Sequence, residues 1–125
     1  MSEAAGETIQ LRRVLVVEDE IMVAMYVEDL LTELGFEVVA MATGLAQALP
    51  LARGAEFDFA VLDINLAGEA SFPVADVLRE RGIPFLFASG YGSKGLIDGY
   101  RTATRIQKPF LSQDLARAIE RMVPY

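Results

Sequence analysis

The feature that most constrains this chain is a series of polar residues, each placed at the end of a short apolar run. Glu18 and Asp19 follow one such run, and Asp63, Ser89 and Lys108 come at the ends of three others. Short runs rich in β-branched and aromatic residues are typical of buried parallel strands. Because ligands bind outside the carboxyl ends of the strands in an open α/β sheet, we expect these side chains to meet at one edge. Acids, a hydroxyl and an amine together suit a divalent cation and a phosphoryl group.

Composition limits the class of protein. The chain has 125 residues, of which 53% are apolar, and this favours one domain with a sizeable core. It contains no cysteine and no histidine, which excludes disulfides, zinc–thiolate sites, imidazole catalysis and a serine–histidine triad. The lack of cysteine fits a cytosolic protein. The net charge of −7 opposes direct binding to nucleic acid, whose phosphates are contacted by lysine and arginine.

The start of the chain differs from the rest. Residues 1–10 are small and acidic and lack an apolar run, which predicts a flexible lead-in and not a secretory signal. Residues 11–125 are predicted to form the single domain. No apolar stretch reaches the roughly 18 residues that a membrane span needs.

Five strand-like runs alternate with helix-like segments, which predicts repeated βα units and a parallel sheet. Ser71 and Ser112 are expected to cap the third and last helices, and Gly82 to end the third. Pro50 should kink or shorten the second helix. Glycines within 90–100 predict either an ordinary loop or a short helix near the limit of stability. The strands are expected near 13–17, 36–41, 57–62, 84–88 and 104–107.

The acidic turn after the first strand predicts a cation site. An anion cannot approach Glu18, Asp19 and Glu20 unless a cation lies between. Mg²⁺ prefers oxygen ligands, and carboxylates from this turn and from Asp63, with a backbone carbonyl near Asn65, would suit it. The alternative is a solvated acidic turn without a metal.

Asp63 ends a run that reads as a buried strand, where a carboxylate costs energy unless it is paired or metal-bound. Such a carboxylate can attack phosphorus and form an acyl phosphate. The alternative is an Asx-turn at Asp63-Ile64-Asn65. Lys108 precedes a proline, which favours an extended backbone, and its ammonium could contact a phosphoryl oxygen or balance the acids. Ser89 could donate a hydrogen bond to the same group, although a serine after a strand is usually a cap.

The segments VLVVEDE, VLDINL, PFLFASGYG and QKPF occur in the order found in receiver domains of two-component response regulators. The chain resembles this family over residues 12–123. The resemblance implies an α/β, flavodoxin-like (βα)5 fold with a doubly wound parallel five-stranded sheet of order 2-1-3-4-5. It also implies that Asp63 is the phospho-acceptor, that Glu18 and Asp19 hold Mg²⁺, and that Asn65 supplies a backbone carbonyl to the metal.

The same resemblance assigns the remaining site positions. Ser89 matches the hydroxyl position, and Lys108 matches the lysine that contacts the phosphoryl group and whose bond to the next proline is typically cis. Receivers usually carry an aromatic switch residue where this chain has Arg105. The string FASGYG resembles the FAT GUY subgroup, which lacks that aromatic, so switching is expected at Ser89, Gly90, Tyr91 and Arg105, with Tyr91 or Tyr100 taking the missing packing role.

The function implied is that of a stand-alone cytoplasmic regulator that accepts a phosphoryl group from a sensor histidine kinase, of the HWE or HisKA2 type. It would act as a phosphate sink or as a regulator of the kinase or another partner, as a monomer or weak homodimer, without separate enzymatic turnover. Two alternatives stay open. One is a pseudo-receiver adaptor that never carries phosphate. The other is an aspartate-nucleophile phosphatase, whose DxD pattern is absent because position 65 is asparagine.

Overall fold

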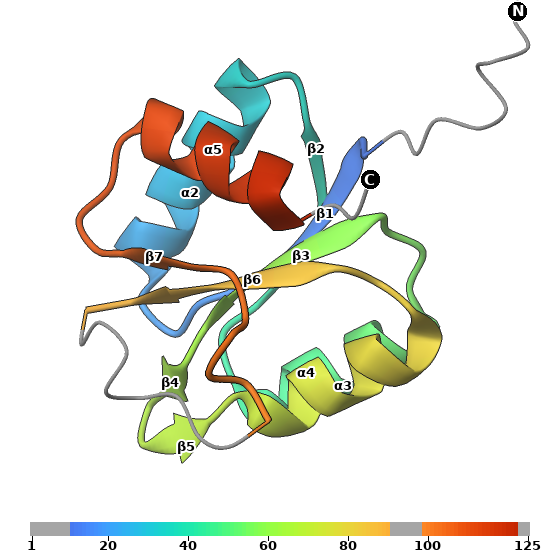
Figure 1. Ribbon diagram of the computed structural model, residues 1–125. Helices are drawn as coiled ribbons and strands as arrows, with labels where there is room; N and C mark the ends of the chain where they lie inside the picture. Colours follow the sequence, from blue (N-terminus) through green and yellow to red (C-terminus); the bar gives the residue numbers. More distant parts are fainter. Residues whose placement is uncertain (1–10, 91–98, 123–125) are drawn as a thin grey trace, which may run out of the picture.

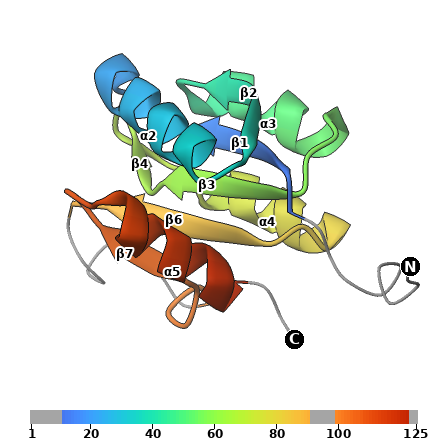
Figure 2. The same ribbon diagram turned by 90° about the horizontal axis from the view of Figure 1, so that it is seen from above.

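The central feature of the molecule is a sheet of five parallel strands with helices on both faces (Figures 1 and 2). The computed structural model describes residues 11–90 and 99–122. The sheet order is β2-β1-β3-β6-β7, which is 2-1-3-4-5 when its strands alone are counted. The fold predicted from the sequence is therefore confirmed. The strands are β1 (Arg13–Val17), β2 (Glu37–Ala42), β3 (Phe59–Asp63), β6 (Phe85–Ser89) and β7 (Arg105–Gln107).

Two helices cover each face of the sheet. α2 and α5 lie on one face, and α3 and α4 lie on the other (Figure 1). Each face has its own apolar core, because alternate strand residues point to opposite sides: Val14 and Val16 belong to one core, and Leu15 and Val17 belong to the other. The helices are α2 (Ile21–Glu33), α3 (Leu45–Gly54), α4 (Phe72–Arg81) and α5 (Ser112–Met122).

The central strand β3 is buried along its whole length, because it has a neighbouring strand on each side and helices above and below. Its register aligns the carboxyl ends of the sheet. Val17 of β1 pairs with Leu62, and Asp63 pairs with Ala88 of β6. The residues that follow β1, β3 and β6 therefore emerge together at one edge, as the order of polar residues predicts.

The helix ends agree only in part with the expectations. Gly82 ends α4 in the left-handed conformation at φ 72°, as predicted. Ser71 precedes α4, but its side chain makes no capping hydrogen bond. Ser112 is already the first residue of α5, and the carboxylate of Asp114 instead accepts the backbone N–H of Leu111 at 2.9 Å. Ser71 therefore holds the predicted N-cap position without the expected hydrogen bond, whereas the prediction for Ser112 was wrong, because Ser112 lies inside the helix.

Pro50 lies inside α3, and the helix continues to Gly54. The proline therefore does not end the helix, because its ring removes only one backbone hydrogen bond.

A small antiparallel hairpin follows β3 and was not predicted. It consists of β4 (Asn65–Leu66) and β5 (Glu69–Ala70), joined by Ala67 and Gly68. Both turn residues have positive φ, 54° and 92°, as a two-residue hairpin turn requires.

The Lys108–Pro109 peptide bond is cis, as the family resemblance implies. Most of the glycine-rich segment, including Tyr91, lies outside the described residues. None of the described helices combines the length and the apolar character that crossing a membrane requires.

Candidate functional site

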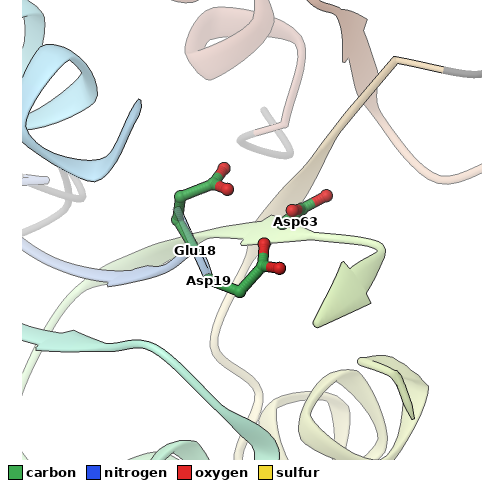
Figure 3. Close-up of side chains that lie close together, drawn as sticks. All are labelled: Glu18, Asp19 and Asp63. Atoms are coloured by element: carbon green, nitrogen blue, oxygen red, sulfur yellow. The ribbon is translucent and has the colours of Figure 1, made fainter. Parts of the chain in front are cut away.

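Three carboxylates gather at the carboxyl edge of the sheet (Figure 3). Glu18 and Asp19 follow β1, and Asp63 ends the neighbouring strand β3. One carboxylate oxygen of each lies within 4.8 Å of the others. The parallel pairing of β1 with β3 explains this, because it brings the two strand ends side by side. The expected convergence of these acids is therefore observed.

Lys108 reaches the same edge from the end of β7. Its Nζ lies 2.7 Å from Oε1 of Glu18 and 3.4 Å from Oδ2 of Asp63. Burial lowers the pKa of Lys108, but the hydrogen bond to Glu18 and the charge of Asp63 outweigh it and raise the pKa overall. Lys108 therefore stays positively charged between the two acids.

Burial and the neighbouring acids disfavour the ionised form of Asp63. Burial, with the charge of Glu18, raises its pKa to about 7, although Lys108 acts in the opposite direction. A carboxyl with so high a pKa is one whose ionised form has too little positive charge around it. A cation beside Asp63 would supply that charge, and three carboxylates fit the oxygen preference of Mg²⁺.

An open pocket of about 350 Å³ lies over these groups. It is lined by Asp19, Glu20, Asp63, Asn65, Gly90 and Lys108. Glu18 is absent from the lining because it is only 3% exposed and lies beneath Lys108. Glu18 thus holds the lysine, while Asp19 and Asp63 face the space that a ligand can enter.

The remaining predicted site residues differ in how they are placed relative to this pocket. Ser89 ends β6, is 2% exposed, and accepts the backbone N–H of Lys108 through its carbonyl oxygen at 2.9 Å. Arg105 is half-buried on β7 and does not line the pocket. Tyr91 lies outside the described part of the chain. Within that part, the structure brings the predicted metal positions and Lys108 together, whereas neither Ser89 nor Arg105 lines the pocket.

The hairpin β4–β5 is tied to the acidic site, and the sequence reasoning missed this. Oδ2 of Asp19 accepts the backbone N–H of Ala67 at 3.1 Å, and Oδ1 of Asn65 accepts that of Gly68 at 2.8 Å. The backbone N–H of Asn65 lies 3.4 Å from Oδ1 of Asp63, a long contact for an Asx-turn. The Ala-Gly pair was the available signal, since a two-residue turn with glycine favours a hairpin.

Tyr100 is buried in the core between α4 and the sheet. Its ring stacks on Phe72 with centroids 5.3 Å apart and meets Phe87 edge-on at 5.7 Å. Its hydroxyl donates to the carboxylate of Asp76. The sequence offered Tyr100 as one of two candidates for an aromatic packing role, and the described structure places it inside the apolar core.

Exposed large apolar side chains gather beside the acidic pocket. Among the described residues six are exposed, and five of these lie on the first half of α2 or just before α5. The hydroxyl of Tyr26 donates to the carbonyl oxygen of Phe110 at 2.7 Å, which joins the two parts. We call this surface the α2 patch; it consists of Ile21, Met22, Met25, Tyr26 and Leu111.

Comparisons with known proteins agree with this geometry. The solution structure of SdrG from Sphingomonas melonis Fr1 is 38% identical, with a TM-score of 0.82, over 90% of this chain and 96% of that one. The BeF3-activated conformation of SdrG, from Pseudomonas melonis Fr1, is 36% identical, with a TM-score of 0.77, over 90% of this chain and 97% of that one.

Among curated proteins, the transcriptional regulatory protein PdtaR of Mycobacterium tuberculosis is 29% identical over 113 residues, 87% of this chain. The chain spans only 55% of the length of PdtaR. The family described as "Response regulator receiver domain" matches residues 14–120. Receiver domains act in two-component signalling, use Mg²⁺ and have histidine kinases as partners. With this match, and with the identity to SdrG over nearly the whole chain, the protein belongs to the response regulator receiver domain family.

Proposed function

We propose that the chain is a single-domain response regulator that accepts a phosphoryl group from a sensor histidine kinase onto Asp63 in a Mg²⁺-dependent reaction. The observation that carries the proposal is the placement of Asp63 beside Glu18, Asp19 and Lys108 under an open pocket. The existence of a BeF3-activated conformation of SdrG supports the same role, because SdrG is similar over nearly its whole length.

The cation site in this proposal consists of Glu18, Asp19, Asp63 and the backbone carbonyl of Asn65. When bound, Mg²⁺ would supply the positive charge that the raised pKa of Asp63 indicates is lacking. Asp19 and Asp63 face the pocket, whereas Glu18 lies beneath it and pairs with Lys108. Glu18 therefore contributes to the cation site from beneath and also orients Lys108.

In the transfer itself, a carboxylate oxygen of Asp63 attacks the phosphorus of a phosphohistidine. The new phosphorus–oxygen bond forms as the phosphorus–nitrogen bond breaks, and the imidazole leaves with the electron pair. The ammonium of Lys108, 3.4 Å from Asp63, stabilises the charge on the phosphoryl oxygens. The hydroxyl of Ser89 and the backbone N–H of Gly90 supply further donors. Attack by water on the same phosphorus then releases inorganic phosphate and restores Asp63.

The response to phosphorylation is proposed to involve Ser89, Gly90, Tyr91 and Arg105. Phosphorylation adds charge and acceptor oxygens that can order a neighbouring segment. The aromatic packing role falls to Tyr100, whose burial against Phe72 and Phe87 supports this assignment. A switch without an aromatic at position 105 fits membership of the FAT GUY subgroup.

The proposed partner is a sensor histidine kinase of the HWE or HisKA2 type. The α2 patch supports docking of a protein over the pocket, because exposed apolar side chains that gather in one place mark interaction surfaces. The chain would act in the cytoplasm as a monomer or weak homodimer, either as a phosphate sink or as a regulator of the kinase or another partner. A sink needs the carboxylate of Asp63, whereas an inhibitor of the kinase does not.

The experiment that tests the proposal is intact mass spectrometry after incubation with acetyl phosphate and Mg²⁺. The parent protein should gain the mass of one phosphoryl group, and omission of Mg²⁺ should prevent the gain. Asp63→Asn should gain none, whereas Asp29→Asn, the same change at an exposed position on α2, should behave as the parent does. Absence of any gain in the parent would favour a pseudo-receiver adaptor, and equal labelling of Asp63→Asn would place the acceptor elsewhere.

A further inference from the structure

The β4–β5 hairpin lies at the rim of the acidic pocket and holds one of its carboxylates. Oδ2 of Asp19 accepts the backbone N–H of Ala67 at 3.1 Å. Ala67 is exposed, whereas Asp19 is half-buried and lines the pocket. A backbone group of the hairpin therefore fixes a side chain that faces the space a cation can enter.

The hairpin is itself held at three points. At its turn, Oδ1 of Asn65 accepts the backbone N–H of Gly68 at 2.8 Å. At its base, the backbone N–H of Ser71 donates to the carbonyl oxygen of Ile64 at 2.8 Å. Between them, the side chain of Leu66 is 1% exposed and packs in the apolar core that α3 and α4 cover. The N–H that reaches Asp19 is thus placed before any ion binds.

The hydrogen bond to the hairpin limits how Asp19 can bind a cation. A carboxylate can coordinate an ion through one oxygen or through both. Figure 3 shows the side chain of Asp19 directed toward that of Asp63. Because Oδ2 of Asp19 is engaged by Ala67, Oδ1 is the oxygen left for an ion in the pocket. Lys108 restricts Asp63 in a similar way, since its Nζ lies 3.4 Å from Oδ2.

Mg²⁺ and Ca²⁺ differ in what they require of such a carboxylate. Mg²⁺ takes an octahedral shell at about 2.0–2.1 Å and keeps several waters, so one oxygen from each acid is enough. Ca²⁺ takes about 6–8 oxygens at about 2.3–2.6 Å and often uses both oxygens of a carboxylate. A carboxylate held by one oxygen therefore removes a ligand that Ca²⁺ would use and removes none from Mg²⁺.

We propose that the β4–β5 hairpin selects the cation, because it holds Asp19 in a one-oxygen binding mode that suits Mg²⁺ better than Ca²⁺. The side chain of Asn65 is the positioning residue, acting on Asp19 through the turn that it holds. This inference rests on the proposed function, since it concerns the same cation site. The role differs from that of the backbone carbonyl of Asn65, because the side chain can be removed while the carbonyl stays.

Truncation of the Asn65 side chain tests the selection. Dissociation constants for Mg²⁺ and for Ca²⁺ are measured by NMR titration of the parent, Asn65→Ala and Gln47→Ala. The last is the control, because it removes an amide whose Oε1 accepts the N–H of Thr43 at 2.9 Å in the loop after β2. The parent should bind Mg²⁺ more tightly than Ca²⁺. Asn65→Ala should weaken Mg²⁺ binding by about tenfold and Ca²⁺ binding by less, so the preference falls.

Gly68→Ala disturbs the same turn without removing a polar side chain. Gly68 has φ 92°, a conformation that strains any residue with a Cβ. This variant should lower the preference for Mg²⁺ as Asn65→Ala does, whereas Gln47→Ala should keep that of the parent. Melting temperatures verify that all three variants fold. Equal weakening of the two ions would show a merely structural role for the hairpin and would overturn the inference.

Hydrogen exchange at the amide of Ala67 tests the binding mode directly. Because Ala67 is exposed, slow exchange of its amide reports the hydrogen bond to Asp19. Exchange should stay as slow at saturating Mg²⁺ as without the ion. Faster exchange with Mg²⁺ would mean that the ion takes Oδ2, and it would refute the inference while leaving the proposed function intact. Failure of the parent to bind Mg²⁺ at all would overturn both.

Discussion

The Nζ atom of Lys108 lies 2.7 Å from Oε1 of Glu18, although 90 positions separate the two residues in the sequence. Glu18 is only 3% exposed, so its charge has little solvent around it. The same ammonium lies 3.4 Å from Oδ2 of Asp63. The residue after the edge strand β7 thus neutralises acids at the ends of β1 and β3.

Replacing Lys108 with methionine should lower the free energy of unfolding by about 3 kcal/mol in metal-free buffer, because removing one partner leaves the buried charge of Glu18 unpaired. Urea denaturation measures the loss. In the Glu18→Gln background the same replacement should cost less, since only Asp63 is then left without its cation. Equal costs in the two backgrounds would mean that the pair is not coupled.

The pH dependence of stability should report the raised pKa of Asp63, which is about 7 against an ordinary value of 3.8. The folded state then binds the proton more tightly than the unfolded state. Without a cation, the contribution of Asp63 to the free energy of unfolding should therefore fall as the pH rises from about 4 to about 7. Asp63→Asn should remove this decline and be more stable than the parent at pH values above about 7. A parallel pH profile for parent and variant would contradict the assignment.

Magnesium should raise the melting temperature of the parent above neutral pH, because a ligand that binds only the folded state stabilises it. The effect should be much smaller for Asp63→Asn and Asp19→Asn, which each lose a charged ligand that faces the pocket. Thermal unfolding with and without millimolar Mg²⁺ provides the measurement, and Asp29→Asn is the matched control. Equal stabilisation of all four proteins would place the cation elsewhere.

Tyr100 should contribute to stability through its ring more than through its hydroxyl. Tyr100→Phe removes the hydrogen bond to Asp76 and should cost about 1–2 kcal/mol. Tyr100→Ala also removes the contacts with Phe72 and Phe87 and should cost about 3–5 kcal/mol. In the parent, burial and Asp76 raise the pKa of Tyr100 to about 12, so one phenol should titrate late in ultraviolet absorbance. Tyr100→Phe should lose that late step.

Met22 lies in the α2 patch and is 80% exposed, so Met22→Glu should leave stability unchanged. Labelling by acetyl phosphate should also stay unchanged, whereas transfer from a phosphorylated sensor kinase should fall by about tenfold, because a charge enters an apolar contact surface. Val39→Glu, which changes an exposed apolar residue of β2 outside the patch, is the control. Equal losses with both phosphoryl donors would show that Met22 affects the acidic pocket itself.

The missing capping hydrogen bond of Ser71 gives a prediction about helix ends. The hydroxyl of Ser71 is buried and makes no hydrogen bond with the described residues. Ser71→Ala should therefore be neutral or slightly stabilising in urea denaturation. Asp114→Ala should cost about 1 kcal/mol, because its carboxylate satisfies the N–H of Leu111. A cost for Ser71→Ala equal to that for Asp114→Ala would restore Ser71 as a cap.

The sheet and the acidic edge were predictable, because both follow from patterns that lie close together along the chain. The run before Glu18 and the run before Asp63 each show a buried strand, and parallel pairing then places the strand ends together. The placement of Lys108 followed from the same rule. The depth of each side chain could not be read in this way: Glu18 lies beneath the pocket, whereas Asp19 faces it, although the two are adjacent in sequence.

The helix caps, the hairpin and the position of Tyr100 were not predictable from single residues, because each depends on contacts with other residues. Ser112 and Asp114 are both suitable capping residues, and the outcome depended on which residue began the helix. The hairpin β4–β5 gains support from Asp19, which lies 48 positions from Ala67. The position of Tyr100 in the core depends on the aromatic residues Phe72 and Phe87, which come from different elements. For the hairpin and for Tyr100, a partner distant in the sequence decides the result.

Lys108 follows the outermost strand β7, and this position has a consequence for folding. Until β7 joins β6, the three carboxylates face one another without their internal counter-charge, and they repel. An incompletely folded chain would thus present a disfavoured, uncompensated anionic cleft to any phosphate donor. A complete set of charges at this edge therefore requires that β7 is paired with β6.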